Sequence, residues 1–264
     1  MSYKFFYLLL NSIPAFFILL VFILREKNKE PLSIVLSTFA LTYIIVLPLD
    51  LLISIADPLI EESFKNQHFH SFEDFFRAAF LEEILKFSVF FLFIYKHTNF
   101  DELSDGIIYG IAVGLGYAVV ENYDYLVGYY MYKEPMKEFV QDRWWALLGH
   151  VSLGIIMGMF LAKSRIKKFN KKIMLSLALC LPIFLHGLHN YTFDSETLYQ
   201  SYVDYYIFAL DVLVIVGSFI VLPKLETIKL EIDDTSNIYK DYVQIFLIGL
   251  TFAIILAILF GFIS

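Results

Sequence analysis

The sequence predicts an all-α fold, a polytopic transmembrane helical bundle with about eight spans. Of its 264 residues, 59% are hydrophobic and 18% are aromatic, whereas soluble domains are about 45–50% apolar. The apolar residues also gather in repeated runs of roughly 20, the number that an α-helix needs to cross about 30 Å of hydrocarbon. We therefore expect residues 1–264 to form a single membrane-embedded domain.

Each predicted span is an apolar range between polar segments. The ranges are 5–24, 32–55, 75–96, 106–130, 144–162, 173–193, 202–222 and 242–263. The first is expected to be a retained span, because it is longer than the apolar core of a signal peptide and lacks a small-residue cleavage site. Residues 56–74 combine acidic residues with phenylalanines, which fits either an interfacial amphipathic segment or a solvated connector. The single cysteine, Cys180, lies within a span and provides no disulfide framework.

The distribution of basic residues predicts the orientation, because cytoplasmic loops are enriched in lysine and arginine. The segments after the first, third, fifth and seventh ranges hold 13 such residues, against five on the side that includes the N-terminus. Both termini are thus predicted to lie outside, and the basic segment 163–172 in the cytoplasm. The net charge of −7, without a basic face elsewhere, argues against nucleic acid as a partner and leaves the lipid bilayer as the surroundings.

Four predicted spans carry ionisable or amide side chains that a lipid-facing helix does not tolerate. In chain order these are Glu82, Glu83 and Lys86, then Glu121 and Asn122, then His150, and finally His186, His189 and Asn190. A lone buried polar group can hold two helices together. Acids on two helices and imidazoles on two others indicate one shared interior site instead.

Residue spacing supports a shared site. Glu82 and Lys86 are four residues apart, so the ammonium group can neutralise that carboxylate, while Glu83 points about 100° away toward another partner. His186 and Asn190 share a helical face through the same spacing. Glycines at helical spacing predict that the fourth and fifth helices pack closely around their polar residues. These glycines are Gly110, Gly114 and Gly116 on one helix and Gly154 and Gly158 on the other.

Carboxylates combined with imidazoles and an amide favour water activation. One glutamate takes a proton from water, while histidine and asparagine donate hydrogen bonds to the developing oxyanion. A divalent metal held by glutamate and histidine, with zinc as the preferred ion, could assist or replace that base. No HExxH motif occurs in the chain, so the common zinc-protease helix is absent.

At these residues the sequence resembles the PrsW family of intramembrane proteases, within the superfamily of type II CAAX prenyl endopeptidases and CPBP proteins. The EExxK motif of that family matches residues 82–86, and its FxxxE motif followed by Asn matches residues 117–122, with Tyr117 in place of Phe. A histidine on a glycine-containing helix matches His150. The last motif, HxxxD or HxxxN, matches residues 186–190. The resemblance covers residues 75–195, the motif-bearing core.

Asn190 departs from the aspartate that is common in PrsW and has the form usual in the prenyl endopeptidases. The resemblance implies hydrolysis of peptide bonds in a membrane-anchored, anti-sigma-factor-like protein of the bacterial plasma membrane, with the first glutamate as base. We expect a catalytic set of Glu82, Glu83, Lys86, His186 and Asn190, and a set that holds a metal or positions water of Glu121, His150 and His186, with His189 as a lesser candidate. The residues themselves leave open which of Glu82 and Glu83 is the base.

The alternative is a non-hydrolytic membrane protein, either a proton-coupled transporter or an assembly scaffold. Proton relays also use buried glutamate and histidine. Transporters, however, often contain paired inverted halves with broken helices, and no such pairing is visible here. A scaffold would tolerate loss of the glutamate pair, which is intact. Processing of prenylated peptides would need a eukaryotic-type substrate, of which the chain gives no indication.

Overall fold

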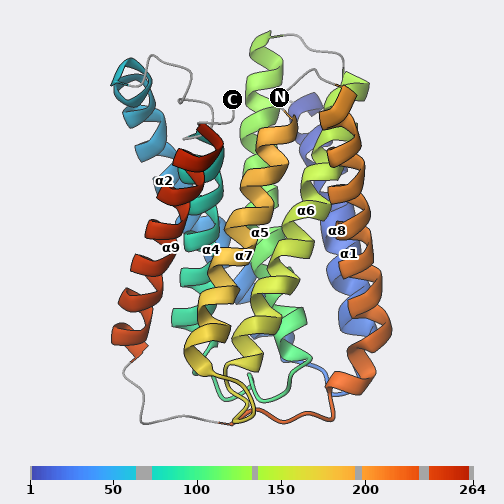
Figure 1. Ribbon diagram of the computed structural model, residues 1–264. Helices are drawn as coiled ribbons and strands as arrows, with labels where there is room; N and C mark the ends of the chain where they lie inside the picture. Colours follow the sequence, from blue (N-terminus) through green and yellow to red (C-terminus); the bar gives the residue numbers. More distant parts are fainter. Residues whose placement is uncertain (1, 64–72, 133–135, 194–197, 232–237, 262–264) are drawn as a thin grey trace.

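The computed structural model describes residues 2–63, 73–132, 136–193, 198–231 and 238–261 (Figure 1). Throughout these ranges the chain is a bundle of helices, and an isolated bridge between Glu102 and Lys229 is the only β-type pairing there. The helical elements are α1 (Ser2–Arg25), α2 (Leu32–Ser63), η1 (Glu73–Phe80), α4 (Leu81–Val89), η2 (Phe90–Ile94), α5 (Asp105–Tyr132), α6 (Met136–Lys163), α7 (Lys171–Phe193), α8 (Leu198–Leu225) and α9 (Ile238–Gly261). The predicted all-α class is confirmed.

Helices occupy all eight predicted ranges, but the number of membrane spans is confirmed only in part. Four helical segments of the described chain are long and apolar enough to cross a membrane, and two shorter apolar helices join them. The four are Arg143–Lys163, Lys171–Tyr191, Tyr205–Leu225 and Ile238–Phe260, and the shorter two are Ser12–Arg25 and Leu32–Val46. The third predicted range, 75–96, is not among these six helical segments. Its α-helix, α4, has only nine residues, and three of them are the charged Glu82, Glu83 and Lys86.

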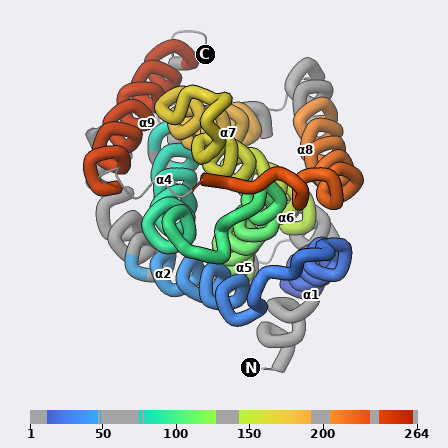
Figure 2. The backbone as a smooth tube through the Cα atoms, turned by 90° about the horizontal axis from the view of Figure 1, so that it is seen from below, coloured from blue at the N-terminus to red at the C-terminus, as the bar shows by residue number. Residues whose placement is uncertain are grey.

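α5 is enclosed by protein, which explains how a helix of moderate hydropathy can lie inside the bundle. Every residue from 102 to 120 is buried, and α5 contacts α1, α2, α4, η2 and α6. Viewed along the bundle in Figure 2, α5 lies between α2 on one side and α6 on the other. A helix buried on all sides needs no uniformly lipid-compatible surface, so it can carry glycines and polar side chains at helix contacts.

A glycine seam brings α5 and α6 into backbone contact. A Cβ atom on Gly110 would lie 2.2 Å from the carbonyl oxygen of Gly154, and one on Gly114 would lie 2.2 Å from that of His150. The seam continues at Gly158, which meets the Gly106 carbonyl group. The predicted close packing of these two helices is therefore confirmed, and it fixes the backbone of His150 directly against α5.

Gly116 does not belong to this seam. A Cβ atom on Gly116 would lie 2.6 Å from the carbonyl oxygen of Phe39 on α2. The expectation that Gly116 joins the contact between the fourth and fifth helices was wrong, because two residues further along a helix the backbone faces another neighbour. Residues 56–63 continue α2, so the connector predicted at 56–74 is in part helical, and residues 64–72 lie outside the described chain.

Figure 1 shows the start of α1 and the end of α9 at the same end of the bundle. The turn between α6 and α7, which holds the basic segment 163–172, lies at the opposite end. This arrangement is what two termini on one side of a membrane and a basic loop on the other side require.

We expect Gly154→Ala to lower the free energy of unfolding by about 1–3 kcal/mol, the usual range for overpacking. The new methyl group would meet the Gly110 carbonyl oxygen at 2.2 Å, which only a shift of the backbone can relieve. Gly217→Ala on α8 is the matched control, since nothing lies within 4 Å of its Cβ position. Thermal unfolding of the detergent-purified variants measures both. Equal stability of the two variants would contradict a close α5–α6 seam.

Candidate active site

The predicted site residues lie on four neighbouring helices. α4 carries Glu82, Glu83 and Lys86, α5 carries Glu121 and Asn122, α6 carries His150, and α7 carries His186, His189 and Asn190. Contacts join α4 to α5 and α7, and join α6 to both α5 and α7. Helical turns of π type precede and follow α4, as η1 and η2. Such turns are rare in proteins, and those that do occur are often found at functional sites.

Lys86 is the hub of the cluster. Its side chain is fully buried, and its Nζ atom lies 2.6 Å from Oε1 of Glu83 and 2.9 Å from Nδ1 of His150. The same ammonium group is 3.7 Å from Oε2 of Glu82 and 4.4 Å from the centre of the Tyr117 ring. A buried ammonium ion requires such compensation, because leaving water costs several kcal/mol per ion. Lys86 thereby connects α4 with α5 and α6.

The contact with Lys86 determines the tautomer of His150. An ammonium group can only donate, so Nδ1 of His150 must accept, and the ring proton resides on Nε2. That N–H donates to Oε2 of Glu121 over 2.7 Å. The other carboxylate oxygen of Glu121 lies 3.5 Å from Nη1 of Arg143, whose guanidinium group stacks over the Tyr125 ring at 3.6 Å. A continuous polar chain therefore runs from α4 to the start of α6.

His186 joins α7 to both glutamates of α4. Its Nδ1 atom lies 2.8 Å from Oε1 of Glu83, so this N–H donates to the carboxylate. On the other side of the ring, Nε2 lies 3.7 Å from Oε2 of Glu82. The ring also meets His150 edge to face, with centroids 5.5 Å apart and planes at 84°. The structure thus brings the predicted glutamates, lysine and two of the three histidines into one cluster.

The two adjacent glutamates differ in accessibility and partners. Oε1 of Glu83 accepts hydrogen bonds from both Lys86 and His186, and its side chain is 0% exposed. The Glu82 side chain is 15% exposed. In both glutamates the buried Oε2 atom has no hydrogen-bond partner. We expected Lys86 to neutralise Glu82 through the four-residue spacing. The structure shows a closer contact with Glu83, three residues away, because both spacings place side chains on neighbouring parts of one helical face.

The formal charges of the cluster do not balance. Glu82, Glu83 and Glu121 supply three carboxylates, whereas Lys86 and Arg143 supply two cations. An unbalanced charge in the interior of a membrane protein has a high free-energy cost. A proton on the cluster or a bound cation would remove the excess.

The predicted metal ligands have suitable donor types but unsuitable positions. Zinc accepts imidazole nitrogen and carboxylate oxygen, yet both ring nitrogens of His150 are already engaged, by Lys86 and by Glu121. Three ligand atoms from Glu121, His150 and His186 do not converge. In the described part of the chain, the only group of three whose donor atoms lie within 4.8 Å of one another is elsewhere. This arrangement fits water activation by a carboxylate, and the metal ligand set stays a prediction.

The other three predicted residues lie on α5 and α7. His189 and Asn190 are half-buried on α7. Asn122 on α5 is 1% exposed, and neither atom of its side-chain amide has a hydrogen-bond partner among the described residues. A buried amide without partners is unusual.

Sequence reasoning missed two residues near the site. Asp211 on α8 is buried and accepts a short hydrogen bond from the hydroxyl group of Ser152, two residues after His150. Its signal was present, since Asp211 is an ionisable residue within a predicted span. Arg143 is one of the five basic residues on the side that includes the N-terminus, and its pairing with Glu121 does not follow from their separation in sequence.

An apolar helical bundle with carboxylates and imidazoles gathered in its interior defines a membrane protein with a buried polar site, of the kind found in intramembrane hydrolases and in proton-coupled transporters. A family model described as "PrsW family intramembrane metalloprotease" matches residues 30–222 of the chain. The chain belongs to this family, and it is a membrane protease. This membership favours the protease over the transporter and the scaffold.

Characterised relatives agree with the family match. Protease PrsW of Oceanobacillus iheyensis is 35% identical over 188 residues, which cover 70% of this chain and 83% of that protein. Protease PrsW of Bacillus subtilis is 32% identical over 180 residues, 67% of this chain and 78% of that protein. The protease PrsW of Geobacillus kaustophilus is 28% identical over 200 residues, 75% and 84% of the two chains. No solved structure gives a significant match. These matches name the PrsW family, and the wider relationship to the prenyl endopeptidases stays a prediction.

We expect Lys86→Met to lower the free energy of unfolding by about 3–5 kcal/mol, because it leaves the buried Glu83 carboxylate without its cation. The double variant Glu83→Gln/Lys86→Met removes both charges and should recover most of this loss. Thermal and chemical unfolding of the purified variants measure the difference. A single variant as stable as the wild-type protein, or a double variant less stable than the single one, would contradict the role of the ion pair.

Proposed function

We propose that the protein cleaves a membrane-anchored protein substrate, of the anti-sigma-factor type, with a water molecule that Glu82 activates. The observation that carries this proposal is the contrast between the two adjacent glutamates. Glu83 is 0% exposed and its Oε1 accepts hydrogen bonds from two donors, whereas the Glu82 side chain is 15% exposed. A general base must be able to reach the proton that it removes.

In this mechanism Glu82 takes a proton from water as the water oxygen attacks the carbonyl carbon of the scissile peptide bond. A tetrahedral intermediate with a negative oxygen results. Protonated His186 donates its Nε2–H to that oxyanion, while Glu83 holds Nδ1 and stabilises the imidazolium charge. The C–N bond then breaks, and the proton on Glu82 passes to the leaving nitrogen. Glu82 returns to the carboxylate form.

The remaining residues hold these two groups in place. Lys86 fixes Glu83 and His150, and Glu121 fixes the far side of the His150 ring. Asn190 lies one helical turn beyond His186, and we assign it a second hydrogen bond to the oxyanion, as the family resemblance implies. Asn122, a buried amide without partners, is assigned to bind the substrate backbone through its donors.

A metal-assisted version would use zinc held by Glu121, His150 and His186, and the family description includes the word metalloprotease. A bound zinc ion would polarise the peptide carbonyl group and lower the pKa of water. We favour the metal-free version, because the hydrogen bonds of His150 to Lys86 and Glu121 oppose its use as a ligand. A chelator that abolishes cleavage, with recovery on addition of zinc, would select the metal-assisted version.

The site lies midway along α6 and, on α7, closer to the Phe193 end. At 1.5 Å per residue, His150 is about 20 Å from the Lys163 end of α6, and His186 is about 22 Å from the Lys171 end of α7. With the basic segment in the cytoplasm of a bacterium, this depth corresponds to the outer half of the membrane. The proposed scissile bond therefore lies inside the membrane, at or beyond its midplane.

We expect Glu82→Gln to reduce cleavage of a reconstituted, membrane-tethered substrate about 10²–10⁴-fold, the usual contribution of a general base. Glutamine keeps the size of the side chain but cannot take the proton. Glu231→Gln is the matched control, since Glu231 is half-exposed and pairs with Lys167 at the other end of the bundle. Unfolding temperatures establish that both variants are folded. Wild-type activity in Glu82→Gln would remove Glu82 from the mechanism, although other residues could still catalyse proteolysis.

The orientation gives a separate prediction. In a Cys180→Ser background, a cysteine introduced at the exposed Lys168 should react with a membrane-impermeant thiol reagent only after cells are lysed, because we place segment 163–172 in the cytoplasm. A cysteine at Lys133, in the segment predicted to lie outside, should react in intact cells. The reverse pattern would place both termini in the cytoplasm.

A further inference from the structure

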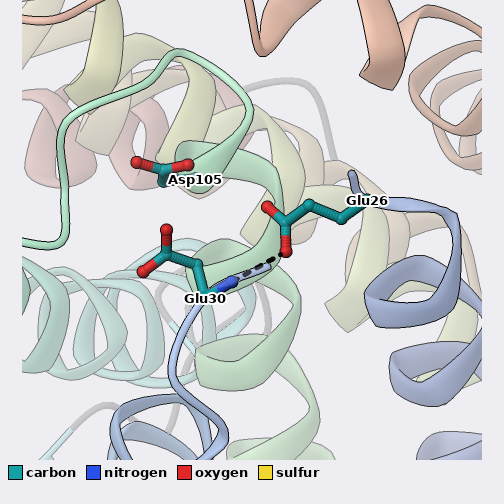
Figure 3. Close-up of side chains that lie close together, drawn as sticks. All are labelled: Glu26, Glu30 and Asp105. Atoms are coloured by element: carbon teal, nitrogen blue, oxygen red, sulfur yellow. Dashed lines mark hydrogen bonds between the residues drawn. The ribbon is translucent and has the colours of Figure 1, made fainter. Parts of the chain in front are cut away.

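A second acidic group lies at the end of the bundle that is remote from the active site. Glu26 directly follows α1, Glu30 precedes α2, and Asp105 is the first residue of α5. One carboxylate oxygen from each of the three lies within 4.8 Å of the other two (Figure 3). Along α5, Asp105 is about 24 Å from Glu121 at 1.5 Å per residue, so this group is separate from the catalytic cluster.

Glu26 and Asp105 are buried, Glu30 is half-buried, and none of the three has a counter-charge among the described residues. Glu26 is 2% exposed and Asp105 is 0% exposed. Among the residues that the structure describes, no lysine, arginine or histidine forms an ion pair with Glu26, Glu30 or Asp105. The basic side chain of Lys229 binds the neighbouring acids Asp101, at 3.1 Å, and Glu102, at 2.5 Å, and not these three carboxylates. Buried charges are normally paired or coordinate a metal.

One carboxylate oxygen of Glu26 points toward Glu30 and Asp105 and has no hydrogen-bond partner. Oε2 of Glu26 accepts the backbone N–H of Glu30 over 3.1 Å, but its buried Oε1 has no hydrogen-bond partner. Figure 3 shows the Glu26 carboxylate turned toward Glu30 and Asp105. A buried oxygen without a partner is energetically costly, and more so when it is charged. Its orientation into the acidic group indicates a missing cationic partner.

The other two carboxylates, of Asp105 and Glu30, accept hydrogen bonds from neighbouring residues. Oδ2 of Asp105 accepts the backbone N–H groups of Asp101 at 2.8 Å and Glu102 at 2.7 Å, and its Oδ1 accepts the Ser104 hydroxyl at 3.4 Å. Glu30 accepts a short hydrogen bond from the hydroxyl group of Tyr109. Without a cation, these groups repel one another.

We propose that Glu26, Glu30 and Asp105 bind a divalent cation that prefers oxygen ligands, such as Mg²⁺, Mn²⁺ or Ca²⁺. Three carboxylates without nitrogen or sulfur donors match these ions, whereas zinc sites generally include histidine or cysteine. The bound cation joins the connection between α1 and α2 to the start of α5. It therefore acts as a clamp on the central helix, at the end opposite the catalytic cluster.

The test measures binding and stability of the full-length purified protein after chelator treatment. Titration with Mn²⁺, followed by the electron paramagnetic resonance signal of free Mn²⁺, should reveal one bound ion per chain that Mg²⁺ or Ca²⁺ displaces. The unfolding temperature should rise by about 5 °C at about 100-fold excess over Kd. Glu26→Gln should weaken Mn²⁺ binding at least tenfold and remove most of this rise. If Glu26→Gln does not fold, Glu30→Gln gives the same comparison at a less buried position.

Two matched controls separate this site from others. Glu82→Gln alters the catalytic cluster, and Glu231→Gln removes a half-exposed acid at the same end of the bundle, and both should bind Mn²⁺ as the wild-type protein does. Absence of bound Mn²⁺ in the wild-type protein would overturn the proposal. Loss of binding in Glu82→Gln with retention in Glu26→Gln would also overturn it, because the cation would then belong to the catalytic cluster.

Discussion

The buried ion pair between Lys86 and Glu83 is the interaction on which the active site depends. At 2.6 Å, with both side chains fully buried, it neutralises two charges that neither lipid nor apolar protein would tolerate alone. The same ammonium group holds His150, and the same carboxylate holds His186. Three helices, α4, α6 and α7, are thereby tied to one pair of atoms. Because Oε1 of Glu83 accepts both of these hydrogen bonds, the adjacent and more accessible Glu82 is the carboxylate that remains for chemistry.

This network requires that the helices approach closely. His150 can reach both Lys86 and Glu121 because the backbone of α6 touches that of α5 at Gly114. The glycine seam thus serves the site as well as the fold, since any larger side chain would separate the two helices. At the other end of α5, the proposed cation site would hold the start of the same helix. The central helix is then positioned from both ends of the bundle.

The sequence was sufficient to predict the all-α class, the helical ranges, the glycine seam and most members of the cluster. Polar residues inside apolar ranges are conspicuous, and glycine spacing has a direct geometric meaning. Other features depend on three-dimensional placement. Whether Lys86 prefers Glu82 or Glu83 depends on His150 and His186, which lie far away in the sequence. The partnership of Arg143 with Glu121, and the meeting of Glu26 with Asp105, likewise arise only once the helices are packed.

The central claim, that Glu82 rather than Glu83 activates water, is tested most directly by chemical rescue. Formate, a small carboxylate, is added to Glu82→Ala and to Glu83→Ala during cleavage of a reconstituted substrate. A carboxylate that acts as a general base can be replaced from solution when its position is accessible, whereas one that anchors a buried lysine and histidine cannot. We predict that formate restores part of the cleavage rate in Glu82→Ala and none in Glu83→Ala. Restoration in Glu83→Ala alone would contradict the account.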